Sequence, residues 1–451
     1  MAEMLMKKSR VLLSALLGAI MIAALTMWGC GSTGTSSYSD PSPTTTKSAT
    51  IITAATLKQW IDEGKLNAPF GSKDRVVVVS QSTFVEWTSK GHIPGAVRLD
   101  ATETSKDRIE GLALAATMMP DGPMMDGLVQ KLGIDANTTI VFSLPKNSSI
   151  YNQSVPFWNF RYWGFSRDRL KILNGGDDAW DVAGLTLATD TVEKYAASTF
   201  CVSNNVALKD MVRYSIGEMI QKVDAIIADP ALKNTWQLID VRGPAITPYL
   251  TNALRLQNAT MYLTRLNGDA AKNFVYPDKQ TFETRLGTLL IKDGVTDVYA
   301  SASKKTVVMC GSSISASPSF VLFDAVLNVP EGNIAMYDGS SSQWNNYNTA
   351  RLTLAFPSAA TDVPALARRN AWTFNSYTSL ANPNALTKNR AQGAFTMTGA
   401  VSIWSVSSPV LGPTDTGMNQ IETADKAYIV PVTSGTGGGG STGGGSTPGG
   451  C

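Results

Sequence analysis

Cys310, at the end of an apolar strand pattern, is the residue of this sequence best placed to do chemistry. The β-branched and apolar run 306–309 precedes it, and a loop of small or apolar residues follows. This loop consists of Gly311, Ser312, Ser313, Ile314, Ser315 and Ala316. Backbone N–H groups in such a loop can curl around an anion as a nest. The sequence therefore predicts a nucleophilic thiolate at Cys310, and a buried structural cysteine is the alternative.

The residues after this loop predict a helix that supports the same thiolate. Ser317 is the expected N-cap, Pro318 the expected first helical residue, and 320–327 the apolar helix. The positive end of that helix would point back toward Cys310. We therefore expect the pKa of the thiol to lie well below the value of about 8.5 of a free cysteine.

Composition removes several other kinds of chemistry. The 451 residues carry 38 Lys and Arg against 36 Asp and Glu, so the net charge of +2 offers no general field for nucleic acid. His92 is the one histidine, which excludes multi-histidine zinc sites and leaves a Ser-His-Asp triad with a single candidate base. The four cysteines, Cys30, Cys201, Cys310 and Cys451, form no C-x-x-C pair. We expect no metal, no cofactor and no nucleic-acid partner.

The elements that must position Cys310 occur in two similar sets. In the first half, runs 76–79, 139–142 and 170–173 read as buried strands, and 155–164 and 179–185 as helices. In the second half, strands at 236–240, 306–310 and 334–339 accompany the 320–327 helix. Strands that alternate with helices predict an α/β fold with parallel sheets covered by helices. We place the halves at 51–190 and 211–350, joined by a connection at 191–210.

Four motifs in this order resemble the rhodanese family. The G-H-I-P-G-A signature is matched at 91–96, and the L-x-G-G-x-x-A-W turn at 173–180. The second half carries an L-I-D-V-R strand at 238–242 and a Y-D-G-S close at 337–340, followed by Trp344. It departs from the pattern at 256–259, where L-Q-N-A stands in place of G-H-I-P-G-A. The resemblance covers roughly residues 55–350 and implies two tandem rhodanese-like domains.

By this resemblance Cys310 holds the nucleophile's place, and Asp240 and Arg242 support the active loop. Thiosulfate enzymes of the family usually carry Arg or Lys in this loop, whereas this loop is neutral. The equivalent loop of the first half begins near Ser143 and has no cysteine, so we expect that half to be catalytically silent. Lys146 in that loop is expected to be a solvated lysine, and His92 a structural hydrogen-bonding residue.

Three functions stay open at this point. The first is transfer of a sulfane sulfur from a small anionic, thiosulfate-like donor to a thiol or other thiophilic acceptor through a persulfide on Cys310. The second uses the same thiolate on selenium or tellurium oxyanions, although the sequence shows no source of electrons for a reductase. The third is a non-catalytic rhodanese-fold scaffold.

The N-terminus resembles a bacterial lipoprotein signal. Basic residues precede the apolar run 11–28, which stops at Gly29-Cys30. We expect residues 1–29 to be removed, Cys30 to be lipidated, and 30–50 to form a flexible tether to the cell envelope, with the outer membrane favoured. An uncleaved membrane anchor is the alternative. Residues 351–433 form an extension without a counterpart in the family, and 434–451 a Gly/Ser-rich tail ending in Cys451.

Lipidation at Cys30 predicts that residues 1–29 are removed and that acyl groups are attached to this cysteine. Mass spectrometry of the wild-type protein should show both changes, whereas a Cys30→Ala protein should carry no acyl groups and keep residues 1–29. A wild-type protein that keeps residues 1–29 and carries no acyl groups would show an uncleaved anchor instead.

Overall fold

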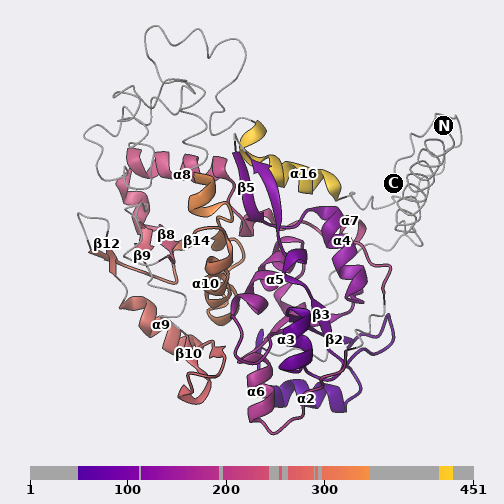
Figure 1. Ribbon diagram of the computed structural model, residues 1–451. Coiled ribbons are helices and arrows are strands. Elements are labelled where there is room, and N and C mark those ends of the chain that lie inside the picture. The colour runs from indigo at the N-terminus through magenta and orange to yellow at the C-terminus, as the bar shows by residue number, and fades with distance from the viewer. Residues whose placement is uncertain are drawn as a thin grey trace, which may run out of the picture.

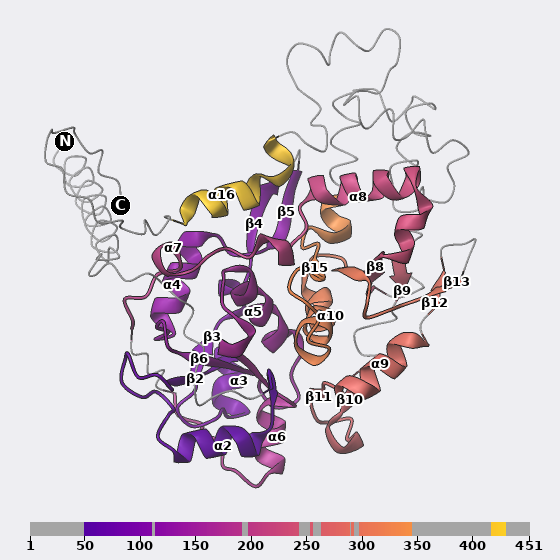
Figure 2. The same ribbon diagram turned by 180° about the vertical axis from the view of Figure 1, so that it is seen from behind.

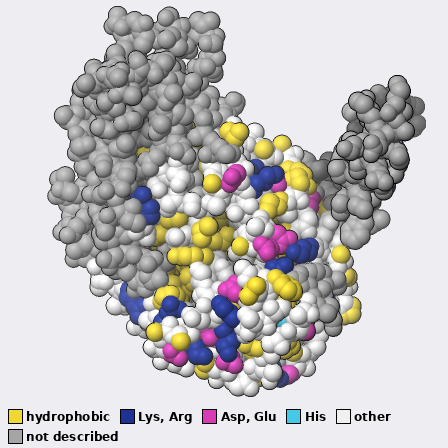
Figure 3. Space-filling view, viewed as in Figure 1, with side chains coloured by type: hydrophobic (Ala, Val, Ile, Leu, Met, Phe, Trp, Pro, Cys, Tyr) yellow, Lys and Arg dark blue, Asp and Glu magenta, His cyan; other side chains and the backbone are white. Residues whose placement is uncertain are grey.

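The computed structural model describes residues 49–110, 113–191, 197–242, 253–255, 263–288, 290–292, 297–344 and 416–429. Cys30 and Cys451 lie outside these residues, as does most of the extension. Within them, no helix is both long and apolar enough to cross a membrane. Figure 3 shows basic and acidic side chains interspersed on one face of this part, as the near-zero net charge suggests.

The first half is built on a five-stranded parallel sheet in the order β1-β7-β6-β2-β3. The strands are β1 (Ile51–Ile52), β2 (Val76–Gln81), β3 (Val97–Leu99), β6 (Thr139–Ser143) and β7 (Leu170–Leu173). The apolar runs predicted to be strands at 76–79, 139–142 and 170–173 are therefore strands. Each is buried along its length, as expected of a sheet covered on both faces.

Helices cover both faces of this sheet (Figures 1 and 2). Alternate residues of β2 divide between two cores: Val77 and Val79 pack with α4 and α5, and Val76 and Val78 with α2, α3 and α6. Successive side chains of a strand point to opposite faces, so one apolar run supplies both cores. These helices are α2 (Ala54–Asp62), α3 (Phe84–Ser89), α4 (Gly122–Lys131), α5 (Tyr151–Tyr162) and α6 (Gly176–Val182).

The second half repeats the arrangement with a four-stranded parallel sheet in the order β15-β14-β8-β9. Its strands are β8 (Trp236–Asp240), β9 (Ala253–Arg255), β14 (Lys305–Met309) and β15 (Ile334–Met336). Its helices are α8 (Ile216–Ala228), α9 (Lys279–Gly287) and α10 (Ser317–Val321). The structure thus confirms the α/β class with parallel sheets and helices.

Three antiparallel hairpins and two further helices complete the described part. The hairpins are β4–β5 (Lys106–Glu110 and Ala113–Met118), β10–β11 (Thr264–Arg265 and Phe274–Val275) and β12–β13 (Leu290–Lys292 and Asp297–Tyr299). The helices are α7 (Val202–Asn205) and α16 (Gln420–Tyr428). Short 3₁₀ turns lie at Ala101–Glu103, Arg167–Arg169, Asp210–Val212, Pro230–Asn234, Leu266–Gly268, Ile314–Ala316 and Thr416–Asn419.

The helix after Cys310 differs from the sequence prediction at its start and in its second turn. It begins at Ser317, so Ser317 is its first residue and not an N-cap, and no side chain caps it. The Ser317 hydroxyl instead donates to the Ile314 carbonyl and pairs with the Ser154 hydroxyl of α5 at 2.7 Å. From Leu322 to Val326 the chain continues as a π-helix. Contacts with α5 therefore replace the capping interaction that the sequence suggested.

The two halves meet where α5 packs against α10, at the centre of the molecule (Figures 1 and 2). Beside this contact, Arg161 of α5 donates from Nε to Asp324 of the second half at 3.0 Å, and both side chains are 1% exposed. Arg167 reaches the same carboxylate at 2.9 Å, and Glu331 accepts from Arg161 at 2.9 Å. A buried charge needs such partners, because its desolvation is costly.

An Asp324→Ala protein should lose about 3–5 kcal/mol of unfolding free energy, since it leaves the Arg161 guanidinium buried without its main partner. Urea unfolding followed by tryptophan fluorescence measures this loss. The double variant Arg161→Met/Asp324→Leu is the control, and should lose less because the charges that then lose a partner, Arg167 and Glu331, are partly exposed to solvent. A single variant within about 1 kcal/mol of the wild type would contradict this reading of the interface.

Candidate active site

Cys310 lies directly after β14, and its side chain is 2% exposed. Its thiol is free. The loop 311–316 folds back over the sulfur and ends in the 3₁₀ turn Ile314–Ala316, so the backbone N–H groups of Ser312, Ser315 and Ala316 donate to it. Ser313 makes this bend possible by adopting a left-handed conformation, with φ of 65°. The predicted cradle of backbone donors around Cys310 is therefore present.

Ser340 fastens the two ends of this cradle, a role that the sequence analysis did not assign to it. Its hydroxyl accepts the N–H of Cys310 at 3.1 Å and the N–H of Ser313 at 3.2 Å. It lies 3.9 Å from the Cys310 sulfur and 2.9 Å from the Tyr337 carbonyl. Ser340 closes the Y-D-G-S motif, and that motif is the sequence signal that could have identified it.

The pKa of the Cys310 thiol is raised, not lowered, which corrects the sequence prediction. Burial is the largest cause, because it disfavours the thiolate. The N–H groups of Ser312, Ala316 and Ser315 and the Ser340 hydroxyl act in the opposite direction without overcoming it. At neutral pH the raised pKa therefore keeps Cys310 as a thiol, surrounded by donors that favour an anion.

The first half carries the same loop with Leu144 in the cysteine's position. The Asp177 N–H donates to the Leu144 carbonyl at 2.9 Å, as the Ser341 N–H donates to the Cys310 carbonyl at 3.0 Å. Ser143, where the sequence analysis began this loop, is instead the last residue of β6, and its hydroxyl donates to Asp177 at 2.6 Å. A leucine side chain offers no nucleophile at this place.

A hairpin from each half covers the loop of the other half. In hairpin β4–β5, Thr117 donates from its hydroxyl to the Ser312 carbonyl at 2.8 Å and accepts the Ser313 hydroxyl on its own carbonyl at 2.7 Å. Beside hairpin β10–β11, Asn273 accepts the Ser148 N–H at 2.7 Å and donates to the Pro145 carbonyl at 3.0 Å. The Cys310 loop is thus completed by the first half, although that half has no cysteine in its own loop.

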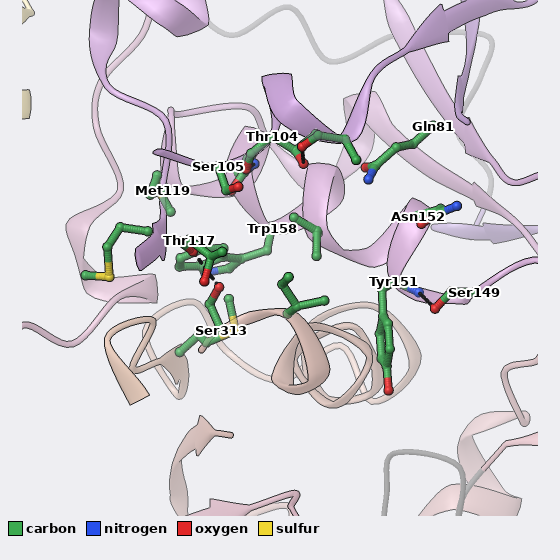
Figure 4. A pocket seen from close by; sticks show the side chains of 16 residues that line it. Gln81, Thr104, Ser105, Thr117, Met119, Ser149, Tyr151, Asn152, Trp158 and Ser313 are labelled. Atoms are coloured by element: carbon green, nitrogen blue, oxygen red, sulfur yellow. Dashed lines mark hydrogen bonds between the residues drawn. The ribbon is translucent and has the colours of Figure 1, made fainter. Parts of the chain in front are cut away.

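A cavity of about 180 Å³ lies between the first half and the Cys310 loop (Figure 4). Thr117 and Ser313 face each other at one side of it, and Gln81 and Asn152 lie at the other. No Lys, Arg, His, Asp or Glu is among the described residues that line it. The amide oxygens of Gln81 and Asn159 are buried in its walls without a protein hydrogen-bond partner. The cavity is therefore uncharged and offers acceptors to a ligand.

The other predicted site residues lie as follows. Asp240 ends β8 beside Met309, and its carboxylate accepts the Arg242 N–H at 3.1 Å and the Arg242 guanidinium at 2.6 Å. Lys146 pairs with Asp181 at 2.8 Å.

His92 stacks on Trp87 with ring centroids 3.5 Å apart, and its Nδ1 lies 3.2 Å from the Trp87 carbonyl, so it has the structural role expected of it. Burial lowers the pKa of His92.

Comparison with known proteins supports the family suggested by the motifs. No protein-family model matches the chain. The thiosulfate sulfurtransferase of Corynebacterium glutamicum is 25% identical over 290 residues, which cover 62% of this chain and 85% of that protein. A putative thiosulfate sulfurtransferase of Mycobacterium leprae is 23% identical over 262 residues, which cover 57% and 83%. The solved structure of the Tum1 protein from Saccharomyces cerevisiae covers 65% of this chain and 94% of its own, at 17% identity and a TM-score of 0.49.

The chain is thus similar to rhodanese-like enzymes of the thiosulfate sulfurtransferase class. In the part that the structure describes, no group of three His, Cys, Asp or Glu side chains is arranged to hold a metal ion.

Burial of Cys310 predicts that its alkylation by iodoacetamide becomes half-maximal above the pH of about 8.5 expected of a free cysteine. A Ser340→Ala variant should shift the midpoint further upward, because it removes one donor that favours the thiolate. A small-molecule thiol alkylated under the same conditions is the control. A midpoint below that of the control would show that the backbone donors outweigh burial.

Proposed function

We propose that this protein transfers a sulfane sulfur through a persulfide on Cys310. The observation that carries the proposal is the cradle itself: three backbone N–H groups and the Ser340 hydroxyl converge on a free thiol. Such donors gain most when the sulfur is anionic. A scaffold protein would have no need to collect donors around a thiol that they do not fully ionise.

The proposed reaction has two steps that balance. The Cys310 thiol first gives its proton to a solvent water molecule, and the thiolate attacks the outer sulfur of the donor. With thiosulfate, the sulfur–sulfur bond of the donor breaks, sulfite leaves with the bonding electrons, and Cys310 keeps the outer sulfur as a persulfide anion. An acceptor nucleophile, such as a thiolate, then attacks that outer sulfur and restores the Cys310 thiolate.

The uncharged surroundings bear on the choice of donor. Neither the loop 311–316 nor the wall of the neighbouring cavity contains a cation among the described residues. A dianion such as thiosulfate therefore lacks charge-assisted hydrogen bonds there, each worth roughly 1.5–3 kcal/mol. We propose that thiosulfate is accepted weakly, and that a donor of lower charge, such as an organic persulfide or trisulfide, is preferred. The buried oxygens of Gln81 and Asn159 support this, because they can accept hydrogen bonds from N–H or O–H groups of such a donor.

Export and lipid attachment at Cys30 belong to the same proposal. They rest on the lipoprotein-like signal alone, since the signal lies outside the described residues. An enzyme tethered in this way would act on sulfur compounds of the cell envelope.

Intact-protein mass spectrometry tests the persulfide. After incubation with thiosulfate or an organic persulfide and removal of excess donor, the protein should gain one sulfur atom, and peptide mapping should place it on Cys310. A Cys310→Ser variant should gain none, because a hydroxyl cannot hold the sulfur, and should lose transfer to a thiol acceptor by at least about three orders of magnitude.

A parallel incubation with selenite separates the alternative activities. Stable selenium on Cys310 without any sulfur adduct would favour chalcogen oxyanion chemistry. An unmodified Cys310 under every condition would favour the scaffold. Full activity of Cys310→Ser with every donor would overturn the sulfurtransferase mechanism.

A further inference from the structure

The C-terminal helix α16 lies on hairpin β4–β5 of the first half, although more than 300 residues separate them in sequence (Figures 1 and 2, yellow helix). The guanidinium of Arg108 in β4 donates to both oxygens of Asp425 at 2.8 and 2.7 Å. Ile421 is buried with Ala115 and Met118 of β5. The side chain of Gln420 donates to the Ile109 carbonyl. The helix is therefore anchored to both strands of the hairpin that contacts the Cys310 loop.

The same helix contributes a carboxylate to a buried cluster around Arg213. Arg213 is fully buried, and its guanidinium lies 3.0 Å from Glu110 of β4, 2.9 Å from Asp338 and 3.2 Å from Glu422 of α16. Glu110 also accepts the Gln343 side chain at 3.1 Å. One buried cation thus joins the hairpin, the Y-D-G-S motif and α16.

Two connections lead from these contacts to Cys310. The first runs through the cluster: Arg213 holds Asp338, which lies two residues before Ser340 in the chain and so fixes its position. The Ser340 hydroxyl in turn accepts the N–H groups of Cys310 and Ser313. Through the hairpin, Thr117 exchanges hydrogen bonds with Ser312 and Ser313. Both supports of the loop around Cys310 therefore contact elements that α16 fixes.

We propose that α16 is a positioning element for the active site, which holds hairpin β4–β5 and the Arg213 cluster so that the loop 311–316 stays closed around Cys310. Glu422 and Asp425 are its positioning residues, and neither touches the reacting sulfur. The inference rests on the proposed sulfur transfer only for its kinetic consequence. Its effect on the exposure of Cys310 is independent of any substrate.

The charges of the cluster make the docking of α16 dependent on pH. Three carboxylates face one guanidinium, and burial raises the pKa of Glu422 to about 8 and also raises that of Glu110. A group whose pKa is raised in the folded state contributes stability at low pH and loses that contribution as the pH rises toward its folded pKa. Docking should therefore weaken between about pH 4.5 and pH 8. The charged groups that act on Glu422 are Arg213, Glu218, Glu110 and Asp210, and Lys426 of α16 pairs with Asp210.

An Ile421→Asp variant of the full chain tests the proposal, because it places a carboxylate on the face of α16 that packs against Ala115 and Met118. Ala424→Asp is the matched control, since it adds the same charge to an exposed position of the same helix. We expect iodoacetamide to modify Cys310 at least about tenfold faster at pH 7.5 in Ile421→Asp, because local opening exposes the sulfur, and at the wild-type rate in Ala424→Asp.

The kinetic measurement uses the same variants with an organic trisulfide as donor. Ile421→Asp should lower kcat/KM at least about tenfold, because hairpin β4–β5 both supports the loop around Cys310 and lines the donor cavity through Thr117 and Met118. If Cys310 becomes more accessible but the wild type forms no persulfide, the proposed function fails and the positioning role stands. If both rates in Ile421→Asp equal those of the control, the positioning role is overturned.

A milder variant covers the case in which Ile421→Asp does not fold. Glu422→Gln keeps the shape of the side chain but cannot ionise, so the docking of α16 should weaken less as the pH rises, although burial also raises the pKa of Glu110 and of Asp425. The fall in thermal unfolding midpoint between pH 5 and pH 8 should then be smaller than in the wild type. An equal fall in both proteins would show that Glu422 does not link α16 to the cluster.

Discussion

The exchange of hydrogen bonds between Thr117 and the Cys310 loop is the constraint on which the site depends. Ser312 and Ser313 bond to the first half through their carbonyl and hydroxyl groups, and to the second half through Ser340. Ser313, with its positive φ of 65°, is therefore held from both halves. This explains why a half with leucine in place of the nucleophile is still needed: it supplies the second wall of the site and most of the cavity beside it.

The reciprocal contact at the Leu144 loop shows what changed between the halves. The Asn273 side chain forms hydrogen bonds with the backbone of that loop. The Asn174 side chain donates to the Tyr276 carbonyl at 3.1 Å and accepts the Tyr276 N–H at 2.8 Å. At the Cys310 loop the residue equivalent to Asn174 is Asp338, a carboxylate. A buried carboxylate needs a cation, and Arg213 provides it. Arg213 also pairs with Glu422, so the need to neutralise Asp338 connects the C-terminal helix α16 to the site.

Short-range patterns allowed much of the fold and the nucleophile to be predicted. β8 has the predicted bounds, 236–240, which follow from its likeness to the buried strands of the first half. The loop after Cys310 was identified because small residues follow a strand end. The interactions that close the loop could not be predicted, since Thr117 meets Ser312 across 195 positions, and α16 meets Arg108 across 317. The Ser317 cap was wrong for a related reason: its partner, Ser154, comes from the other half.

The error in the direction of the Cys310 pKa shift bears on how the site works. Sequence reveals the donors around the sulfur but not the depth of its burial, and burial is the larger effect here. Donors that fail to ionise the resting thiol still bond an anion more strongly than a neutral group. Their contribution therefore increases as negative charge develops on the sulfur during attack, and again when a persulfide anion is formed. Interactions that are stronger in the transition state than in the resting state accelerate a reaction, whereas those already satisfied at rest do not. The donors around Cys310 belong to the first kind, because they bond a neutral thiol weakly and an anionic sulfur strongly. They keep this difference only if the surrounding elements hold them in place and prevent them from moving to better partners while the thiol is protonated.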